Sequence, residues 1–107
     1  MLPAHNLLDE AAVIYKVLGN NTRLMILYYL RYQEKAVAVS QIVDDLGLAQ
    51  PIVSKQLGIL YRYQLVCRHK KGTRVFYALD DPHIVEMTDG MLNHVRHEIN
   101  DEPHPNK

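Results

Sequence analysis

The stretch SQIVDDLGLAQPIVSKQLGILYRY, residues 40–63, decides the fold. Ser40 is expected to cap a short helix over residues 41–46, which Gly47 ends. Pro51 suits the first position of a second helix that runs to about residue 63. This second helix has an apolar inner face at helical spacing, formed by Val53, Leu57 and Leu60. Two short helices joined by a tight turn that contains glycine are typical of a helix-turn-helix.

Two β-type runs follow this pair of helices, over residues 65–69 and 74–79. The turn between them, Lys70-Lys71-Gly72-Thr73, supplies a glycine for a hairpin and places two lysines near its tip. A helix-turn-helix followed by a hairpin with a basic tip predicts a winged helix.

The remaining chain predicts three more helices. Those before the helix-turn-helix are expected over residues 7–19 and 22–33, with Asn20 or Asn21 as a cap, and a connector follows over residues 34–39. Apolar residues nearly encircle the helix over residues 22–33, so we expect it to be central and buried. Asp80 or Asp81 should cap the last helix, which Pro82 opens and which ends near Ile99.

The predicted fold is mostly α with a small β-hairpin, a winged helix-turn-helix of five helices plus a wing. We expect one DNA-binding and dimerisation domain over residues 1–99, with a homodimer formed through the terminal helices. The polar tail over residues 100–107 is expected to be disordered. With 107 residues the chain suits one small domain, for which dimerisation adds burial. The lone Cys67, with no signal peptide and no long apolar run, favours a cytoplasmic protein without membrane contact.

The net charge of zero conceals a strong segregation of charge. Residues 46–79 hold six of the twelve basic residues and none of the twelve acids. A segment of one sign is the electrostatic footprint of a protein that binds a polyanion, although a solvated basic face is the alternative. The outward side chains near the start of the helix at residues 50–63 can read base edges, and the other basic residues can hold phosphates. The candidate DNA-binding residues are Gln50, Pro51, Ser54, Lys55, Gln56, Arg62, Arg68, Lys70, Lys71 and Arg74.

The last helix carries a set of candidate metal ligands: Asp81, His83, His94 and His97. One aspartate and three histidines make a tetrahedral ligand set for Zn²⁺. Because His83 and His94 lie roughly 16 Å apart along a helix axis, one straight helix cannot bring both to one ion. Two antiparallel copies could do so, with Asp81 and His83 of one chain meeting His94 and His97 of the other. Surface histidines on a polar helix face are the alternative interpretation.

Gly90 lies midway between the two ligand pairs, where two antiparallel helices would cross. A glycine inside a helix costs about 1 kcal/mol relative to alanine, so close packing of two backbones is a natural reason for it. Met87 and Met91 are expected to pack across this crossing. The apolar residues expected to turn toward each chain's own core are Leu92, Val95 and Ile99.

These residues resemble the ArsR/SmtB family of metal-sensing repressors. The resemblance covers residues 17–97, through VLGNNTRL at residues 17–24, the helix at residues 50–60 and GTRVFYAL at residues 72–79. The Asp81-x-His83…His94-x-x-His97 spacing is similar to that of the CzrA-like zinc/cobalt sensors. The helix at residues 41–46 holds no cysteine, so the thiolate site that some family members use is absent.

The resemblance implies a dimeric repressor that binds operator DNA as the apo form and is released by Zn²⁺ or Co²⁺. It also implies that His94 reaches the backbone carbonyl of Gln64, which links the metal to the DNA-reading helix. Ni²⁺ also suits nitrogen and oxygen ligands. A regulator that senses a non-metal signal and a metal-buffering protein without DNA binding are alternatives. An enzyme is disfavoured, since four protein ligands leave no open position on zinc, and no small-molecule substrate is implied.

Overall fold

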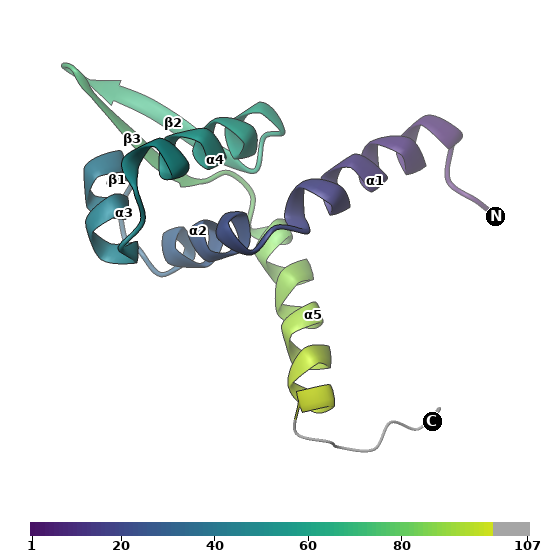
Figure 1. The fold of residues 1–107 in the computed structure, drawn as a ribbon. Helices are drawn as coiled ribbons and strands as arrows, with labels where there is room; N and C mark the ends of the chain where they lie inside the picture. Colours follow the sequence, from purple (N-terminus) through teal and green to yellow (C-terminus); the bar gives the residue numbers. More distant parts are fainter. Residues whose placement is uncertain (100–107) are drawn as a thin grey trace.

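The computed structural model describes residues 1–99 and has the element order expected of a winged helix (Figure 1). Its elements are α1 His5–Leu18, α2 Asn21–Arg31, β1 Val37–Ala38, α3 Val39–Leu46, α4 Gln50–Arg62, β2 Val66–Lys71, β3 Arg74–Leu79 and α5 Pro82–Ile99. The predicted five helices and hairpin wing are therefore confirmed. The tail predicted to be disordered lies outside the described residues.

Local turn chemistry fixes two of the helix ends as expected. The side chain of Asn20 caps α2 by accepting a hydrogen bond of 2.9 Å from the backbone N–H of Arg23. Gly47 ends α3 in the left-handed conformation, with φ of 66°, which glycine adopts without the clash that a Cβ atom brings. The predicted cap at Ser40 is wrong, because α3 begins at Val39 and Ala38 precedes it.

The connector predicted at residues 34–39 contains a short strand instead. β1 pairs antiparallel with β3, with Val37 opposite Tyr77, so the sheet has three strands in the order β1-β3-β2. The chain leaves β1 directly into α3, which is why Ser40 falls inside the helix rather than at its cap. In the wing, Lys71 pairs with Arg74, and Gly72 has a φ of 64° in the tight turn between them.

The core lies where α2, α3 and α4 pack on the start of the wing. The three residues predicted for the inner face of α4, Val53, Leu57 and Leu60, are 0% exposed. Buried residues of α2 meet them: Ile26, Leu27 and Leu30. The expectation that α2 is buried all round is wrong in one respect, because Met25 is 39% exposed.

α1 and α5 extend away from this body as two arms (Figure 1). Near the start of α5, Val85 is buried and Ile84 packs against the core. The prediction that the end of α5 turns toward its own core is wrong: Val95 and Ile99 are 39% and 76% exposed, and Leu92 is only half-buried. The helix departs from the body before it reaches these positions. Among residues 1–99, every helix is too short or too polar to cross a lipid bilayer.

Candidate nucleic-acid interface and metal-ligand residues

The outer face of α4 presents the polar side chains that the sequence places there. Because Val53, Leu57 and Leu60 point into the core, Gln50, Ser54 and Lys55 are exposed near the start of the helix. Backbone N–H groups and the positive end of the helix dipole lie at the same end, where they favour a phosphate group. This face therefore presents hydrogen-bonding side chains and a positive charge together at the start of α4.

Gln56 differs from its neighbours because it has a partner inside the protein. Its side-chain oxygen accepts a hydrogen bond of 2.7 Å from the guanidinium of Arg23, whose Nε donates to the backbone oxygen of Val17 at 2.6 Å. Gln56 thus braces α4 against the start of α2. Local sequence patterns do not reveal this contact, since Gln56 and Arg23 lie 33 residues apart.

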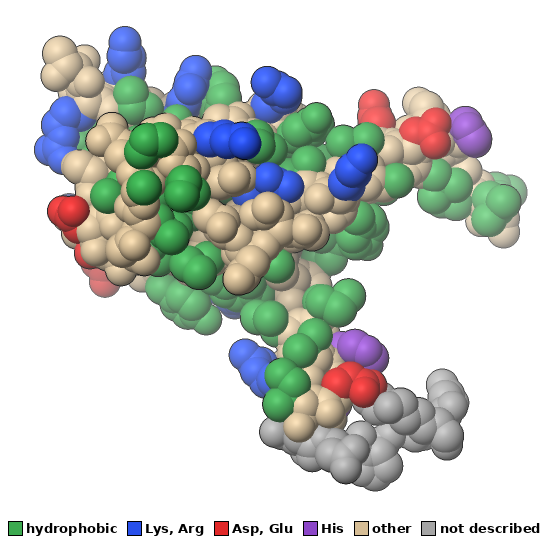
Figure 2. All heavy atoms as spheres, in the orientation of Figure 1, with side chains coloured by type: hydrophobic (Ala, Val, Ile, Leu, Met, Phe, Trp, Pro, Cys, Tyr) green, Lys and Arg blue, Asp and Glu red, His purple; other side chains and the backbone are tan. Residues whose placement is uncertain are grey.

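The basic residues of the segment at residues 46–79 are all exposed, and they belong to α4 and the wing. Figure 2 shows the blue Lys and Arg side chains gathered along the face that carries α4 and the wing. They are Lys55, Arg62, Arg68, Lys70, Lys71 and Arg74. Because no carboxylate lies in the same segment, α4 and the wing together carry a charge of one sign.

Asp81 and His83 form a preorganised pair at the start of α5. Oδ1 of Asp81 accepts a hydrogen bond of 2.9 Å from the backbone N–H of His83 and lies 2.8 Å from Nδ1 of the same imidazole. The backbone bond from His83 is the largest cause that lowers the pKa of the Asp81 carboxyl group. The carboxylate therefore caps the helix, as predicted, and also fixes the orientation of the ring.

His94 and His97 lie in the last turns of the same helix and are exposed. Within residues 1–99 of one protomer, no three side chains of histidine, cysteine, aspartate or glutamate come close enough to share a metal ion. This agrees with the distance argument from the sequence, in which the two ligand pairs lie at opposite ends of one helix. A site made of all four residues requires a second chain.

Asp89, halfway along α5, ties this helix to α2. Its carboxylate accepts a hydrogen bond of 2.9 Å from the hydroxyl of Tyr28 and forms an ion pair with Arg31. The bond from Arg31, and then that from Tyr28, lowers the pKa of Asp89. Burial, followed by the bond to Asp89, raises the pKa of Tyr28 to about 12. Sequence reasoning missed this contact, which joins α5 to α2 in addition to the packing of Ile84 and Val85.

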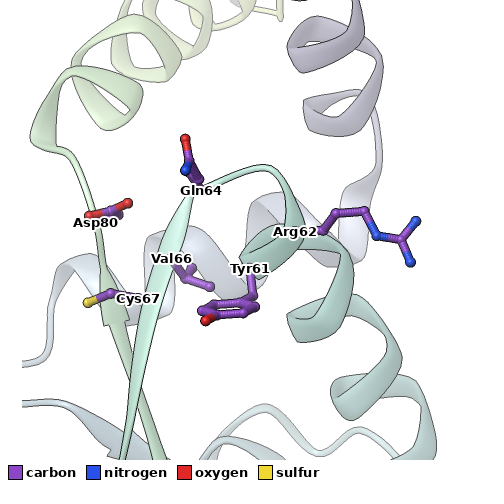
Figure 3. Close-up of a pocket in the computed structure, with 6 residues that line it drawn as sticks. All are labelled: Tyr61, Arg62, Gln64, Val66, Cys67 and Asp80. Atoms are coloured by element: carbon purple, nitrogen blue, oxygen red, sulfur yellow. The ribbon is translucent and has the colours of Figure 1, made fainter.

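The corner between α4 and β2 approaches the corner between β3 and α5. Gln64 occupies it with a left-handed φ of 61°, and the N–H of Asp80 donates to the carbonyl of Leu65 at 3.3 Å. Gln64 and Asp80 line a pocket at this corner. Figure 3 shows these two residues across from each other, while the guanidinium of Arg62 points away from the pocket. Cys67 lines the same pocket and is exposed.

Comparison with known proteins places this architecture in one family. Residues 20–67 match the family model for bacterial regulatory proteins of the arsR family. The chain is 38% identical to the HTH-type transcriptional regulator MJ1325 of Methanocaldococcus jannaschii, over 74% of this chain and 88% of that protein.

Two solved structures share the fold over nearly their full lengths. The antimony-specific transcriptional repressor AntR superposes with a TM-score of 0.80 at 25% identity, covering 94% of this chain and 89% of AntR. The homodimeric winged helix-turn-helix DNA-binding domain of Mb0332 from Mycobacterium bovis gives a TM-score of 0.77 at 25% identity, covering 97% and 98%. The chain belongs to the arsR family of bacterial regulatory proteins and is a winged helix-turn-helix transcriptional regulator rather than an enzyme.

Proposed function

We propose that this chain is a metal-responsive transcriptional repressor. In this proposal a metal-free homodimer binds operator DNA. Binding of Zn²⁺ or Co²⁺ between the subunits then releases the dimer from the operator. Asp81 and His83 of one chain and His94 and His97 of the other are the ligands. The carrying observation is the oriented Asp81–His83 pair at one end of an exposed helix whose other end holds two more histidines.

The exposed face of α4 supports the DNA-binding part of the proposal. Gln50 and Ser54 suit base edges in the major groove, and Lys55 suits guanine or a phosphate. Pro51 holds the start of the helix that presents them. The basic residues proposed to hold phosphates on either side are Arg62, Lys70, Lys71 and Arg74.

The apolar face of α5 supports a homodimer through the terminal helices. Met87 and Met91 are exposed, and a Cβ atom added at Gly90 would meet nothing within 4 Å in the protomer. A second α5 that crosses at Gly90 would cover both methionines and give the glycine its packing role. The relative Mb0332 is homodimeric, which supports a homodimer for this chain as well.

The ligand chemistry supports a metal signal. The two proposed ligands Asp81 and His83 already lie together, with Oδ1 of Asp81 2.8 Å from Nδ1 of the imidazole. A cation bound by both groups would take the place of this contact. Both contacts with His83 use Oδ1 of Asp81, while a carboxylate has a second oxygen that can bind a cation. When bound, the metal would supply a rigid link between subunits. The antimony-specific relative AntR supports an inorganic signal for this fold.

The link to DNA is proposed to pass through the corner that holds Gln64. His94 of the second chain would donate its remaining ring N–H to the carbonyl of Gln64, directly after α4. The neighbouring residue, Leu65, already accepts a hydrogen bond from Asp80, which precedes the proposed ligand Asp81. Both proposed ligand pairs would then be connected by hydrogen bonds to the end of α4, the proposed DNA-reading (recognition) helix.

The test is a titration of the DNA upstream of the protein's own gene with apo protein, followed by Zn²⁺. Allosteric coupling of about 1–3 kcal/mol predicts that zinc weakens wild-type affinity by roughly 5- to 150-fold. His97→Ala should bind DNA like wild type but lose the response to zinc. His5→Ala, which removes an exposed histidine of α1, is the matched control and should keep the response.

Each outcome of this titration separates the candidate functions. DNA binding that zinc does not change would identify a regulator with a non-metal signal. Tight zinc binding without DNA binding would identify a metal-buffering protein. A response to zinc that survives in His97→Ala would remove that residue from the site.

A further inference from the structure

Arg68 contacts an aromatic ring of α4, whereas Arg74 lies 5.2 Å from the ring centroid of Phe76 in its own strand. The Cζ of Arg68 lies 3.9 Å from the ring centroid of Tyr61, which belongs to the last turn of α4. At this distance the guanidinium lies directly on the ring face, in a cation–π contact that arginine makes well because it is planar and weakly hydrated. The contact joins the wing to the recognition helix.

A second tyrosine engages the same guanidinium from the neighbouring strand. Arg68 lies opposite Tyr77 in the register of β2 and β3, and Tyr77 is buried. A hydrogen bond to the Tyr77 side chain is the largest cause that raises the pKa of Arg68, and Tyr61 adds to it. Arg68 therefore lies beside tyrosines of two other elements, Tyr61 of α4 and Tyr77 of β3, although it is exposed on the surface.

The place of Arg68 on the strand explains this arrangement. Alternate residues of a strand share a face, so Arg68 lies on the same face of β2 as Val66, which is buried in the core. Beyond Val66 a pocket opens between α4 and the wing, lined by Tyr61, Arg68, His69, Lys70 and Val75. The arginine bridges the two elements where the core no longer joins them.

We propose that Arg68 is a positioning residue that sets the angle of the wing on the recognition helix through Tyr61 and Tyr77, rather than a ligand of DNA phosphate. This inference rests on the proposed DNA-binding function. The tip of the wing beyond His69 and Phe76 is a two-stranded ribbon without β1, and such a ribbon alone is marginally stable, so its distance from α4 depends on contacts at its base. DNA requires α4 in the groove and the wing tip on nearby phosphates at the same time.

Salt dependence of DNA affinity distinguishes the two roles. Each phosphate contact contributes about 0.9 to the slope of the logarithm of affinity against the logarithm of salt concentration. Lys70→Gln, on the same face of β2 and nearer the tip, should reduce this slope by about 0.9. Arg68→Gln should instead weaken binding by roughly three- to tenfold, as expected for loss of a cation–π contact, with the slope unchanged. A slope that falls by about 0.9 in Arg68→Gln would overturn the proposal.

A double-mutant cycle tests whether Arg68 acts through Tyr61. Tyr61→Leu should weaken DNA binding as Arg68→Gln does, and the double variant should be no weaker than either single variant. Tyr61→Phe keeps the aromatic ring that Arg68 contacts, so this variant should bind DNA with the affinity of wild type. Additive losses would refute the action through Tyr61.

A spectroscopic readout without DNA separates this proposal from the proposed function. The NMR resonances of the Arg68 side chain should be shifted by the Tyr61 ring current in wild type and in Tyr61→Phe. They should return to unshifted values in Tyr61→Leu. Shifted resonances with no DNA binding by wild type would contradict the proposed function, whereas unshifted resonances in wild type would contradict the Arg68 contact.

Discussion

Replacing Gln64 with glycine should stabilise the protein. Among residues 1–99, Gln64 is the one non-glycine residue with positive φ, at 61°. It ends α4 in the pattern that usually takes glycine: its own N–H donates to the carbonyl of Tyr61 at 3.0 Å, and the N–H of Leu65 donates to the carbonyl of Leu60 at 2.9 Å. The backbone bonds fix the left-handed conformation, and the Cβ atom of glutamine bears the steric cost.

The magnitude follows from two opposing terms. The left-handed conformation costs an L-residue about 1–2 kcal/mol, which glycine avoids. Glycine loses more chain entropy on folding, which returns about 0.5–1 kcal/mol of that gain. At the midpoints of these two ranges, the net increase in the free energy of unfolding is about 0.75 kcal/mol. For a domain of this size, that increase raises Tm by about 3–6 °C.

Thermal and urea unfolding of the metal-free protein measure this change. Protein concentration is held fixed, because dimerisation makes Tm concentration-dependent. Gln64→Ala is the matched control: alanine removes the side chain but keeps the Cβ atom, so Tm should not rise. If Gln64→Gly is no more stable than Gln64→Ala, the strain argument is wrong.

Three further predictions concern the helix contacts. Asp89→Asn should weaken the link between α5 and α2. Because the folded state lowers the pKa of Asp89, this carboxylate contributes to the free energy of unfolding above about pH 4, and the contribution is lost as pH falls further. The stability of the variant should therefore vary less with pH in that acidic range. Parallel pH profiles of the two proteins would count against this role. Asn20→Ala should lower the free energy of unfolding by about 1 kcal/mol through loss of the α2 cap, and an equal loss in Asn21→Ala would argue against capping. Gly90→Ala should make the helix more favourable by up to about 1 kcal/mol yet raise the dimer dissociation constant roughly tenfold in sedimentation. Gly58→Ala, at another open helical position, should leave dimerisation unchanged, and equal behaviour of the two variants would place the helix crossing elsewhere.

The parts of the fold that the sequence predicts well depend on local chemistry. Asn20 at a helix start, Gly47 at a helix end and Gly72 in a hairpin each satisfy their own backbone within a few residues. The inner face of α4 is predictable for a similar reason, because helical spacing selects the residues that point one way. These features need no knowledge of the rest of the chain.

The features that the sequence does not predict depend on distant residues. β1 is two residues long, and it is a strand only because β3 pairs with it from forty residues further along the chain. The contacts of Gln56 with Arg23 and of Asp89 with Arg31 likewise join residues 33 and 58 positions apart. For Val95 and Ile99, helical spacing identifies an apolar face but does not identify what covers it. Both residues are exposed in the protomer, so the core of the same chain does not cover this face.

The candidate metal ligands can be identified from local spacing, but how they would meet depends on a second chain. Their placement on α5 also has a mechanical consequence. The first half of α5 is fastened to its own body, through Asp80 to the corner of α4 and through Asp89 to α2. The last turns, which carry His94 and His97, extend away from that body. Each proposed site would therefore join the projecting end of one helix to the fastened end of the other. A metal ion with short, directional bonds would then fix how the two bodies, and so the two α4 helices, are oriented. DNA binding requires a set spacing between those two α4 helices. A metal ion that favours a different orientation of the two bodies must therefore lower operator affinity, whereas one that favours the DNA-bound orientation would not.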